Sequence, residues 1–187
     1  MTVASDWDAR YAAGECSSSK DPGKLLKEFI AALPKGKALD IACGEGRNAI
    51  FLAKNGYDVD AVDVSAVAIK NGDKTAEKEG VRVNFIQADM EQYKIQVETY
   101  DLIVNYNYLQ RTLVSGIKNG LKKGGVIIFE TYTMEQQTIG PPKNPEFLLK
   151  PNELLRLFEG MHIFFYREGI FEEEIKKAIA SLAGKRL

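Results

Sequence analysis

Two aspartates and a glycine turn are the residues of this chain whose spacing could hold a ligand. Asp40 ends an apolar run, Gly44 and Gly46 follow it, and Asp63 ends a second apolar run about twenty residues after the turn. Glycines at such a point allow a tight turn that brings backbone N–H groups close to a ligand. A carboxylate after the second run can accept the hydroxyl hydrogens of a ribose. The pattern predicts a site for an adenosine-containing cofactor.

The glycine spacing alone leaves two cofactor classes open. Gly44, Gly46 and Ala49 satisfy the G-x-G-x-x-G/A fingerprint, so an NAD-dependent oxidoreductase is one alternative. Asp40 favours another ligand, because a buried carboxylate ahead of the turn would repel a pyrophosphate and attract a cation. S-adenosylmethionine carries a sulfonium and an ammonium and has no phosphate. The structural alternative is that Asp40 caps the turn and Asp63 begins a loop.

Further motifs resemble the class I S-adenosylmethionine-dependent methyltransferases over nearly the whole chain. The family's acidic-x-Gly-x-Gly-x-Gly loop matches residues 40–46, with Ala42 where the first glycine is expected. Later matches are Ala88, Asp89 and Met90 after the third predicted strand, Asn105 at the end of the fourth, and LKKGGVIIFET leading into the fifth. WDARY, CGEGRNA, NYLQR and GPPKNPEFLL are similar to a small tellurite-resistance-like (methyltransferase type 11/12-like) subgroup.

This resemblance implies S-adenosylmethionine as the cofactor and a role for each matching position. Asp40 and the turn would hold the methionine part, and Asp63 the ribose hydroxyls. Asp89 would bind the adenine amino group with Met90 against the ring. Asn105 would lie under the sulfonium, and its alternative is a strand-end residue bonded to nearby backbone. The predicted cofactor-binding set is Asp40, Ala42, Cys43, Gly44, Gly46, Asn48, Asp63, Val64, Ala88, Asp89, Met90 and Asn105.

The elements that position these residues follow from the spacing of apolar residues. Strand and helix patterns alternate over residues 37–132, which indicates an α/β fold with a parallel sheet covered on both faces. The predicted strands are 38–43, 58–63, 82–87, 100–105, 126–131, 162–167 and 177–183, and the predicted helices are 23–33, 47–55, 65–79, 111–121 and 152–159. The resemblance implies a Rossmann-like three-layer sandwich with seven mostly parallel strands and an antiparallel last strand. We expect one domain over 1–187, with 1–22 as a lid and 134–150 as an active-site-side loop.

Candidates for contact with a methyl acceptor lie outside the cofactor motifs. Methyl transfer from a sulfonium needs an in-line nucleophile and exclusion of water, and a general base only when the acceptor is protonated. No Ser/His/Asp or Cys/His constellation is present, so we predict no catalytic residue. The acceptor-contact candidates are Trp7, Arg10, Tyr11, Tyr106, Arg111 and Tyr132. The alternative for Trp7 and Tyr11 is a helix face packed on the sheet, and for Arg111 a solvent-exposed side chain.

Composition narrows the class of substrate. The chain has 187 residues, 27% of them charged, and a net charge of -1, which gives no basic surface for a nucleic acid. Without a long apolar run or a basic leader, we expect a cytoplasmic protein that does not bind a membrane. Two cysteines and one histidine predict no metal site. The expected acceptor is therefore a small molecule, such as a thiol or a tellurite- or selenite-type oxyanion. A non-catalytic cofactor-binding protein remains an alternative, and the oligomeric state stays open.

Overall fold

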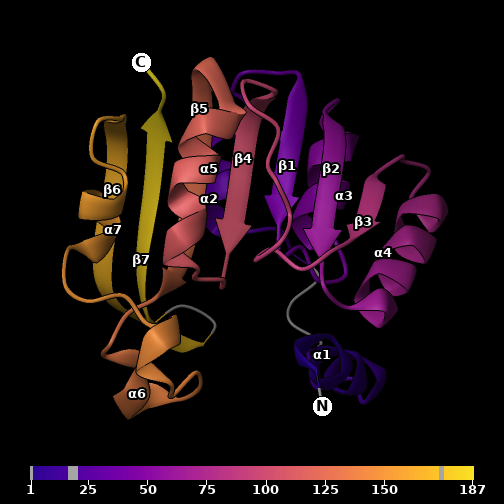
Figure 1. The fold of residues 1–187 in the computed structure, drawn as a ribbon, viewed down its shortest axis with the longest axis horizontal. Coiled ribbons are helices and arrows are strands. Elements are labelled where there is room, and N and C mark those ends of the chain that lie inside the picture. Colours follow the sequence, from indigo (N-terminus) through magenta and orange to yellow (C-terminus); the bar gives the residue numbers. More distant parts are fainter. Residues whose placement is uncertain (1, 17–20, 173–174) are drawn as a thin grey trace.

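A seven-stranded sheet forms the centre of the computed structural model, which describes residues 2–16, 21–172 and 175–187 (Figure 1). The strand order is β3-β2-β1-β4-β5-β7-β6. Strands β1 to β5 pair in parallel, and β7 is antiparallel to both β5 and β6. The predicted α/β class with an antiparallel last strand is confirmed. The strands are β1 (Lys37–Ile41), β2 (Asp58–Asp63), β3 (Asn84–Gln87), β4 (Tyr100–Tyr106), β5 (Leu121–Tyr132), β6 (His162–Glu172) and β7 (Lys176–Lys185).

Helices cover both faces of this sheet. One face packs against α2 (Lys24–Phe29) and α3 (Arg47–Lys54), whose Leu25 and Leu52 belong to one core cluster. The partly buried Ile69 of α4 (Ala66–Lys78) packs against the same cluster. The opposite face packs against α5 (Val114–Gly120) and α7 (Glu153–Leu157), whose Ile117 and Leu154 belong to the other cluster. Because both faces are covered, residues on both sides of the central strands are buried.

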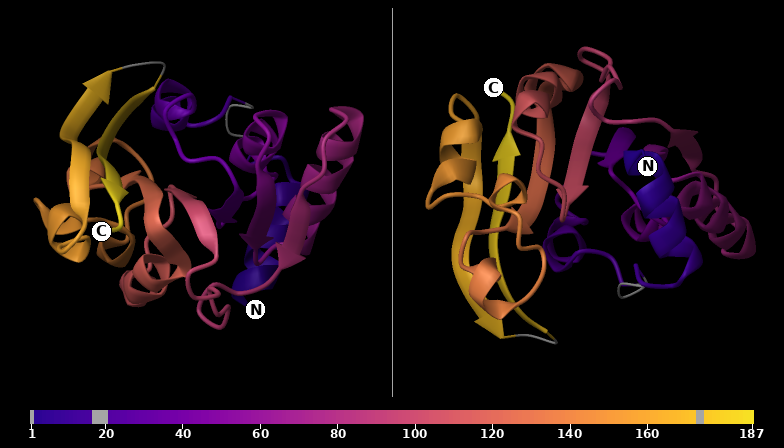
Figure 2. Two further views of the ribbon diagram at one scale, coloured as in Figure 1. Left: turned by 90° about the horizontal axis from the view of Figure 1, so that it is seen from above. Right: turned by 60° about the horizontal axis from the view of Figure 1, so that its bottom comes forward.

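The chain reverses its direction of travel across the sheet between β1 and β4. From β1 it proceeds outward to β2 and β3, then returns and proceeds the other way through β4 and β5. In open α/β sheets, ligands bind beyond the carboxyl ends of the strands at such a switch point. At this carboxyl edge α1 (Val3–Ala12) lies below β1 and β2, whereas α6 (Gln136–Ile139) lies below the β6–β7 end (Figures 1 and 2). Both flank the expected ligand position.

Several predicted boundaries were wrong. The predicted helix 111–121 is a short 3-10 turn, η1 (Arg111–Leu113), followed by α5, and Leu121 already belongs to β5 because it pairs with Tyr100. Strand β3 begins at Asn84, α2 ends at Phe29, and β6 extends to Glu172.

The segment 134–150, predicted to be a loop, contains α6 and the 3-10 turn η2 (Pro145–Phe147). The buried side chain of Gln136 holds it, because Oε1 accepts from the N–H of Ala178 at 2.8 Å and Nε2 donates to the carbonyl of Pro141 at 2.9 Å. Among the described residues, no helix is long and apolar enough to cross a membrane. Residues 1 and 17–20 of the predicted lid lie outside the described residues.

Candidate cofactor site at the carboxyl edge of the sheet

Asp40 is a buried carboxyl group at the carboxyl end of β1. The residue is 1% exposed, and its Oδ2 accepts a hydrogen bond from the N–H of Ala49 at 3.0 Å. Ala49 is the third residue of α3, so Asp40 caps the first turn of that helix. Burial raises the pKa of Asp40 from 3.8 to about 7, while the charge of Arg47 and the hydrogen bond from Ala49 oppose the rise. A cation placed beside this carboxyl would favour its ionised form.

The turn between β1 and α3 needs left-handed backbone at three positions. The φ angle is +49° at Ala42, +57° at Gly44 and +76° at Gly46. Glycine adopts this region freely, whereas another L-residue pays about 1–2 kcal/mol. Ala42 is therefore the strained residue of the turn, and this strain is the physical consequence of having alanine where the resembled family has glycine.

Asp63, at the carboxyl end of β2, connects this turn to the start of α4. The residue is 7% exposed, its Oδ2 accepts from the N–H of Gly44 at 2.8 Å, and its Oδ1 accepts from the N–H of Ser65 at 2.9 Å. Burial raises the pKa of Asp63, and these backbone N–H groups oppose the rise. Each oxygen retains a lone pair after these bonds. The carboxylate predicted to bind the ribose thus lies directly against the predicted glycine turn.

Asn105 presents an unpaired acceptor near the end of β4. The residue is 1% exposed, its Nδ2 donates to the carbonyl of Tyr108 at 2.8 Å, and its Oδ1 is buried with no hydrogen-bond partner among the described residues. Leaving a buried acceptor unpaired costs about 1–3 kcal/mol, so this atom can accept a hydrogen bond from a water molecule or a ligand. The bond to Tyr108 is the contact with nearby backbone that was the alternative for Asn105. Asn105 pairs with Ile41 of β1, which places it beside the strand that leads into the glycine turn.

The residues after β3 extend the site next to Asp63. The N–H of Ala88 donates to the backbone carbonyl of Asp63 at 2.9 Å. Oδ1 of Asp89 accepts from the N–H of Glu91 at 2.9 Å, which leaves its second oxygen without a hydrogen bond from that turn. Met90 is 4% exposed and belongs to the core cluster on the α5 side.

Two further predicted positions, Cys43 and Val64, lie beside the turn. Cys43 is buried, its N–H donates to the carbonyl of Val62 at 3.0 Å, and burial raises the pKa of its thiol. Val64 directly follows Asp63 and is half-buried. Both contribute backbone and volume to the wall of the site.

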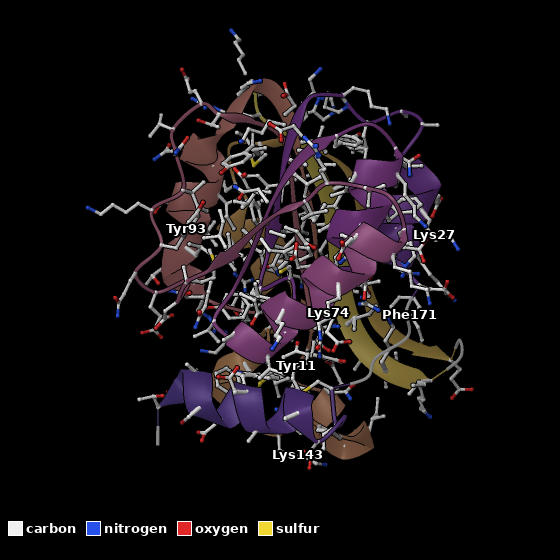
Figure 3. All side chains as sticks on the ribbon, turned by 90° about the vertical axis from the view of Figure 1, so that its right-hand side faces the viewer. Tyr11, Lys27, Lys74, Tyr93, Lys143 and Phe171 are labelled. Atoms are coloured by element: carbon white, nitrogen blue, oxygen red, sulfur yellow. The ribbon has the colours of Figure 1, made fainter. Side chains whose placement is uncertain are left out.

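Helix α1 places Tyr11 against the glycine turn. A Cβ atom added at Gly44 would lie 2.5 Å from the Tyr11 hydroxyl, and Figure 3 shows Tyr11 on the side of α1 that faces the rest of the molecule. The Trp7 ring lies 6.2 Å from the Tyr11 ring, and Cζ of Arg10 lies 4.5 Å from the Trp7 ring centroid. The other contact of the Arg10 guanidinium is with Glu15, at 3.9 Å. Tyr11 thus lies at the turn, whereas these contacts of Arg10 stay within the N-terminal segment.

Two predicted ligand contacts instead have structural partners. Tyr106 is 6% exposed, and its hydroxyl accepts from the N–H of Leu26 at 3.0 Å under α2. Oδ1 of Asn48, a predicted cofactor contact, accepts from the N–H of Gly23 at 2.8 Å and so fixes the start of α2 to α3. Tyr132 is half-buried at the end of β5, and burial raises its pKa. Within the described part of the chain, the Tyr132 hydroxyl has no hydrogen-bond partner, in contrast to the Tyr106 and Asn48 side chains.

The model of the family described as "Tellurite resistance protein TehB" matches residues 23–180. The chain belongs to the TehB family. The predicted membership of the class I S-adenosylmethionine-dependent methyltransferases, in a tellurite-resistance subgroup, is thereby confirmed.

Individual relatives agree with the TehB family. A protein of Haemophilus influenzae named "Probable S-adenosyl-L-methionine-dependent methyltransferase TehB" is 30% identical over 143 residues, which make up 73% of this chain and 49% of that protein. The chain thus spans about half the length of the curated relatives it matches.

Solved structures agree with the fold. The crystal structure of TehB from Haemophilus influenzae matches with a TM-score of 0.77 at 24% identity, over 95% of this chain and 66% of that chain. An S-adenosylmethionine-dependent methyltransferase from Aquifex aeolicus matches with a TM-score of 0.70 at 20% identity, over 100% of both chains.

The residues present at this candidate site fit S-adenosylmethionine. The buried Asp40 provides a negative charge for a cationic ligand, the oxygens of Asp63 retain lone pairs for hydroxyls, and Oδ1 of Asn105 needs a donor. A pyrophosphate offers only acceptor oxygens and negative charge, so it could not donate a hydrogen bond to any of these three groups.

Arg111 was predicted to contact an anionic acceptor, and the structure gives it other partners. Its Nε and one terminal nitrogen bind both carboxylate oxygens of Glu153 at 2.6 and 3.0 Å, and its terminal nitrogens also donate to the carbonyls of Glu146 and Leu148. The hydrogen bond to Glu153 raises the pKa of Arg111 and lowers that of Glu153. Arg111 therefore ties η1 to the segment around η2 and to the first residue of α7.

We expect Arg111→Ala to lower the free energy of unfolding by about 1–2 kcal/mol, because it removes a bidentate charged pair at a partly exposed site. The acceptor KM should stay within about twofold of wild type, because Arg111 binds other residues of the protein and not a ligand. Urea unfolding and steady-state kinetics measure both quantities. Arg156→Ala is the matched control, because Arg156 donates to one carbonyl, that of Pro151, at an exposed position. A large rise in KM with unchanged stability would restore the acceptor role.

Sequence reasoning missed two residues of this edge, Asp8 and Ser65. Oδ1 of Asp8 accepts from the hydroxyl of Ser65 at 2.6 Å and from the N–H of Val67 at 3.1 Å. A serine before an apolar-periodic stretch predicts a helix N-cap, and Ser65 is one, since its hydroxyl accepts from the N–H of Ala68. Nothing local to Asp8 indicated its partner, because the two residues are 57 positions apart.

Proposed function

We propose that this chain binds S-adenosylmethionine at the carboxyl edge of its sheet and transfers the methyl group to a small anionic acceptor. The observation that carries the proposal is the placement of Asp40 and Asp63 on either side of one glycine turn at the switch point, in a chain of the TehB family. The three relatives named above include proteins described as S-adenosylmethionine-dependent methyltransferases, and none is described as a nicotinamide-dependent enzyme.

Each site residue has a defined task in such a reaction. When bound, S-adenosylmethionine supplies a methyl group on a positively charged sulfur. Asp40 provides negative charge near the cationic end, Asp63 accepts from the ribose hydroxyls, and Oδ1 of Asn105 accepts from a donor of the methionine part. Tyr11 and α1 exclude water from the turn. Positioning and exclusion of water account for the catalysis that these residues provide.

The proposed acceptor class is a thiolate or an oxyanion of the tellurite or selenite type. Such acceptors are already nucleophilic near neutral pH and need no general base. This agrees with the sequence, which has no Ser/His/Asp or Cys/His constellation. Burial raises the pKa of the Tyr11 hydroxyl, which keeps this hydroxyl protonated. The family description, which names tellurite resistance, supports the oxyanion branch of this proposal.

The test is a transfer assay with labelled S-adenosylmethionine and separate panels of small thiols, tellurite and selenite. We expect turnover with at least one panel and loss of about 100-fold or more in Asp63→Asn, because that variant weakens the cofactor site. Cofactor binding without transfer to any panel would support the non-catalytic alternative. Thermal stabilisation by NAD and not by S-adenosylmethionine would refute the cofactor assignment.

A further inference from the structure

Helix α1 makes polar contacts with the rest of the chain. It is ten residues long and none of its residues is buried, although it is well capped by Thr2 and Ser5. An isolated helix of this length is marginal in water, and without a buried apolar face the hydrophobic effect holds it only weakly. Its position over the sheet edge therefore depends on the few side chains that reach the rest of the chain.

The contacts of Asp8 join α1 to the first turn of α4. Val67 is the second residue of α4 after the cap Ser65, so its N–H has no partner within the helix. Oδ1 of Asp8 accepts from this N–H and from the Ser65 hydroxyl. A carboxylate is favoured at a helix N-terminus, and the two hydrogen bonds hold the pKa of Asp8 below its usual value. Asp8 acts as a second cap supplied by a distant segment.

Ser65 connects this contact to the cofactor site. The N–H of Ser65 donates to Oδ1 of Asp63, and Oδ2 of Asp63 accepts from the N–H of Gly44. One helical turn beyond Asp8, Tyr11 places its hydroxyl against the same Gly44. Helix α1 thus contacts both walls of the site, with Asp8 at the β2–α4 junction and Tyr11 at the β1–α3 turn.

We propose that Asp8 is a positioning residue that holds α1 as a lid over bound cofactor, through the hydrogen bonds from Ser65 and Val67 that we call the Asp8 latch. This inference rests on the proposed cofactor site. With the latch formed, α1 covers the glycine turn and slows release of the cofactor. When the latch opens, Tyr11 is the side chain described above that still contacts the rest of the chain, at Gly44.

Asp8→Ala tests the latch, with Asp6→Ala as the matched control. Asp6 is an exposed carboxylate on the same helix, so its removal changes the charge of α1 equally and leaves the latch intact. We expect S-adenosylhomocysteine to dissociate about tenfold faster from Asp8→Ala and within about twofold of wild type from Asp6→Ala. Asp8→Asn, which keeps a neutral acceptor, should lie between them. Stopped-flow displacement measures the rates.

Amide hydrogen exchange at Val67 supplies a second readout that needs no cofactor. Because Asp8 is the acceptor for this N–H, we expect faster exchange in Asp8→Ala than in Asp6→Ala. Equal exchange in the two variants would refute the latch, and faster exchange with unchanged release would refute its action as a lid. If wild type fails to bind S-adenosylhomocysteine, the proposed function fails and the lid with it, while exchange at Val67 still reports the Asp8 contact separately.

Discussion

Asp63→Asn is expected to weaken binding of S-adenosylmethionine by about 100-fold or more, close to 3 kcal/mol. The carboxylate accepts from the N–H of Gly44 with one oxygen and from the N–H of Ser65 with the other. An asparagine can accept with one atom alone, so its amide group would face one of these buried N–H groups as a second donor. The turn would shift, and one acceptor for the ribose would be lost. Isothermal titration with purified protein measures the effect.

Asp60→Asn separates this effect from a general loss of stability. Asp60 lies on the same strand, is 6% exposed, and accepts from the hydroxyl of Tyr100 at 2.9 Å and from Nδ2 of Asn84 at 2.8 Å. Its substitution should lower the melting temperature, because it disturbs buried partners, yet leave the cofactor Kd within about twofold. If both variants lose affinity equally, Asp63 acts through the fold and not through contact with the cofactor.

The central fold was predictable because its signal is local. Strands β1, β2 and β4 are buried along most of their length, and each has a polar residue at or next to its carboxyl end, namely Asp40, Asp63 and Asn105. Strand β3 is only partly buried, and its start was placed too early. The start of β5 was missed because LKKGG has the composition of a turn, although Leu121 pairs with Tyr100. That pairing joins two separate segments of the chain, so the sequence around Leu121 does not predict it.

The site residues likewise divide into those with a local sequence signal and those whose contacts are long-range. Asp40, Asp63 and the glycine turn were predictable because strand ends and turn glycines fix their position. Arg111 and Tyr106 were assigned to the ligand because each follows the predicted strand 100–105, but their partners Glu153 and Leu26 lie 42 and 80 positions away. A long-range partner decides whether a polar side chain is available to a ligand, and the sequence around it does not encode that partner.

Asp40 caps helix α3 in the structure and is the proposed partner of a cationic ligand, and these two roles set opposing demands on its charge. As a cap it needs only a hydrogen-bond acceptor for Ala49, whereas a cationic ligand needs the ionised form. Burial has raised its pKa from 3.8 to about 7 against the opposing charge of Arg47, with the Asp63 carboxylate contributing in the same direction as burial. Between these two values the folded protein holds a proton that the unfolded chain has lost. The contribution of Asp40 to the free energy of unfolding is therefore fully present below pH 3.8 and is lost as the pH rises towards 7.

We expect Asp40→Asn to gain stability relative to wild type as the pH rises from 4 to 8, by about 2–4 kcal/mol, because asparagine caps Ala49 without a buried charge. Relative to wild type, the affinity of Asp40→Asn for S-adenosylmethionine should fall over the same pH range. Wild type should bind more tightly as Asp40 ionises between about pH 6 and 8, by up to about tenfold per pH unit below the pKa, whereas the variant should lack this rise.

Urea unfolding and calorimetric titration across this pH range measure the two quantities, and the difference between wild type and Asp40→Asn removes the titration of the cofactor's own amino group. Asp101→Asn is the control, because the Asp101 carboxylate accepts from the N–H of Lys37 and from Nζ of Lys122 rather than facing the glycine turn. Its affinity profile should follow that of wild type. Parallel profiles for wild type and Asp40→Asn would show that Asp40 is a cap alone. A difference that grows with pH would show that the energy lost by burying this carboxylate is recovered when the cationic cofactor binds.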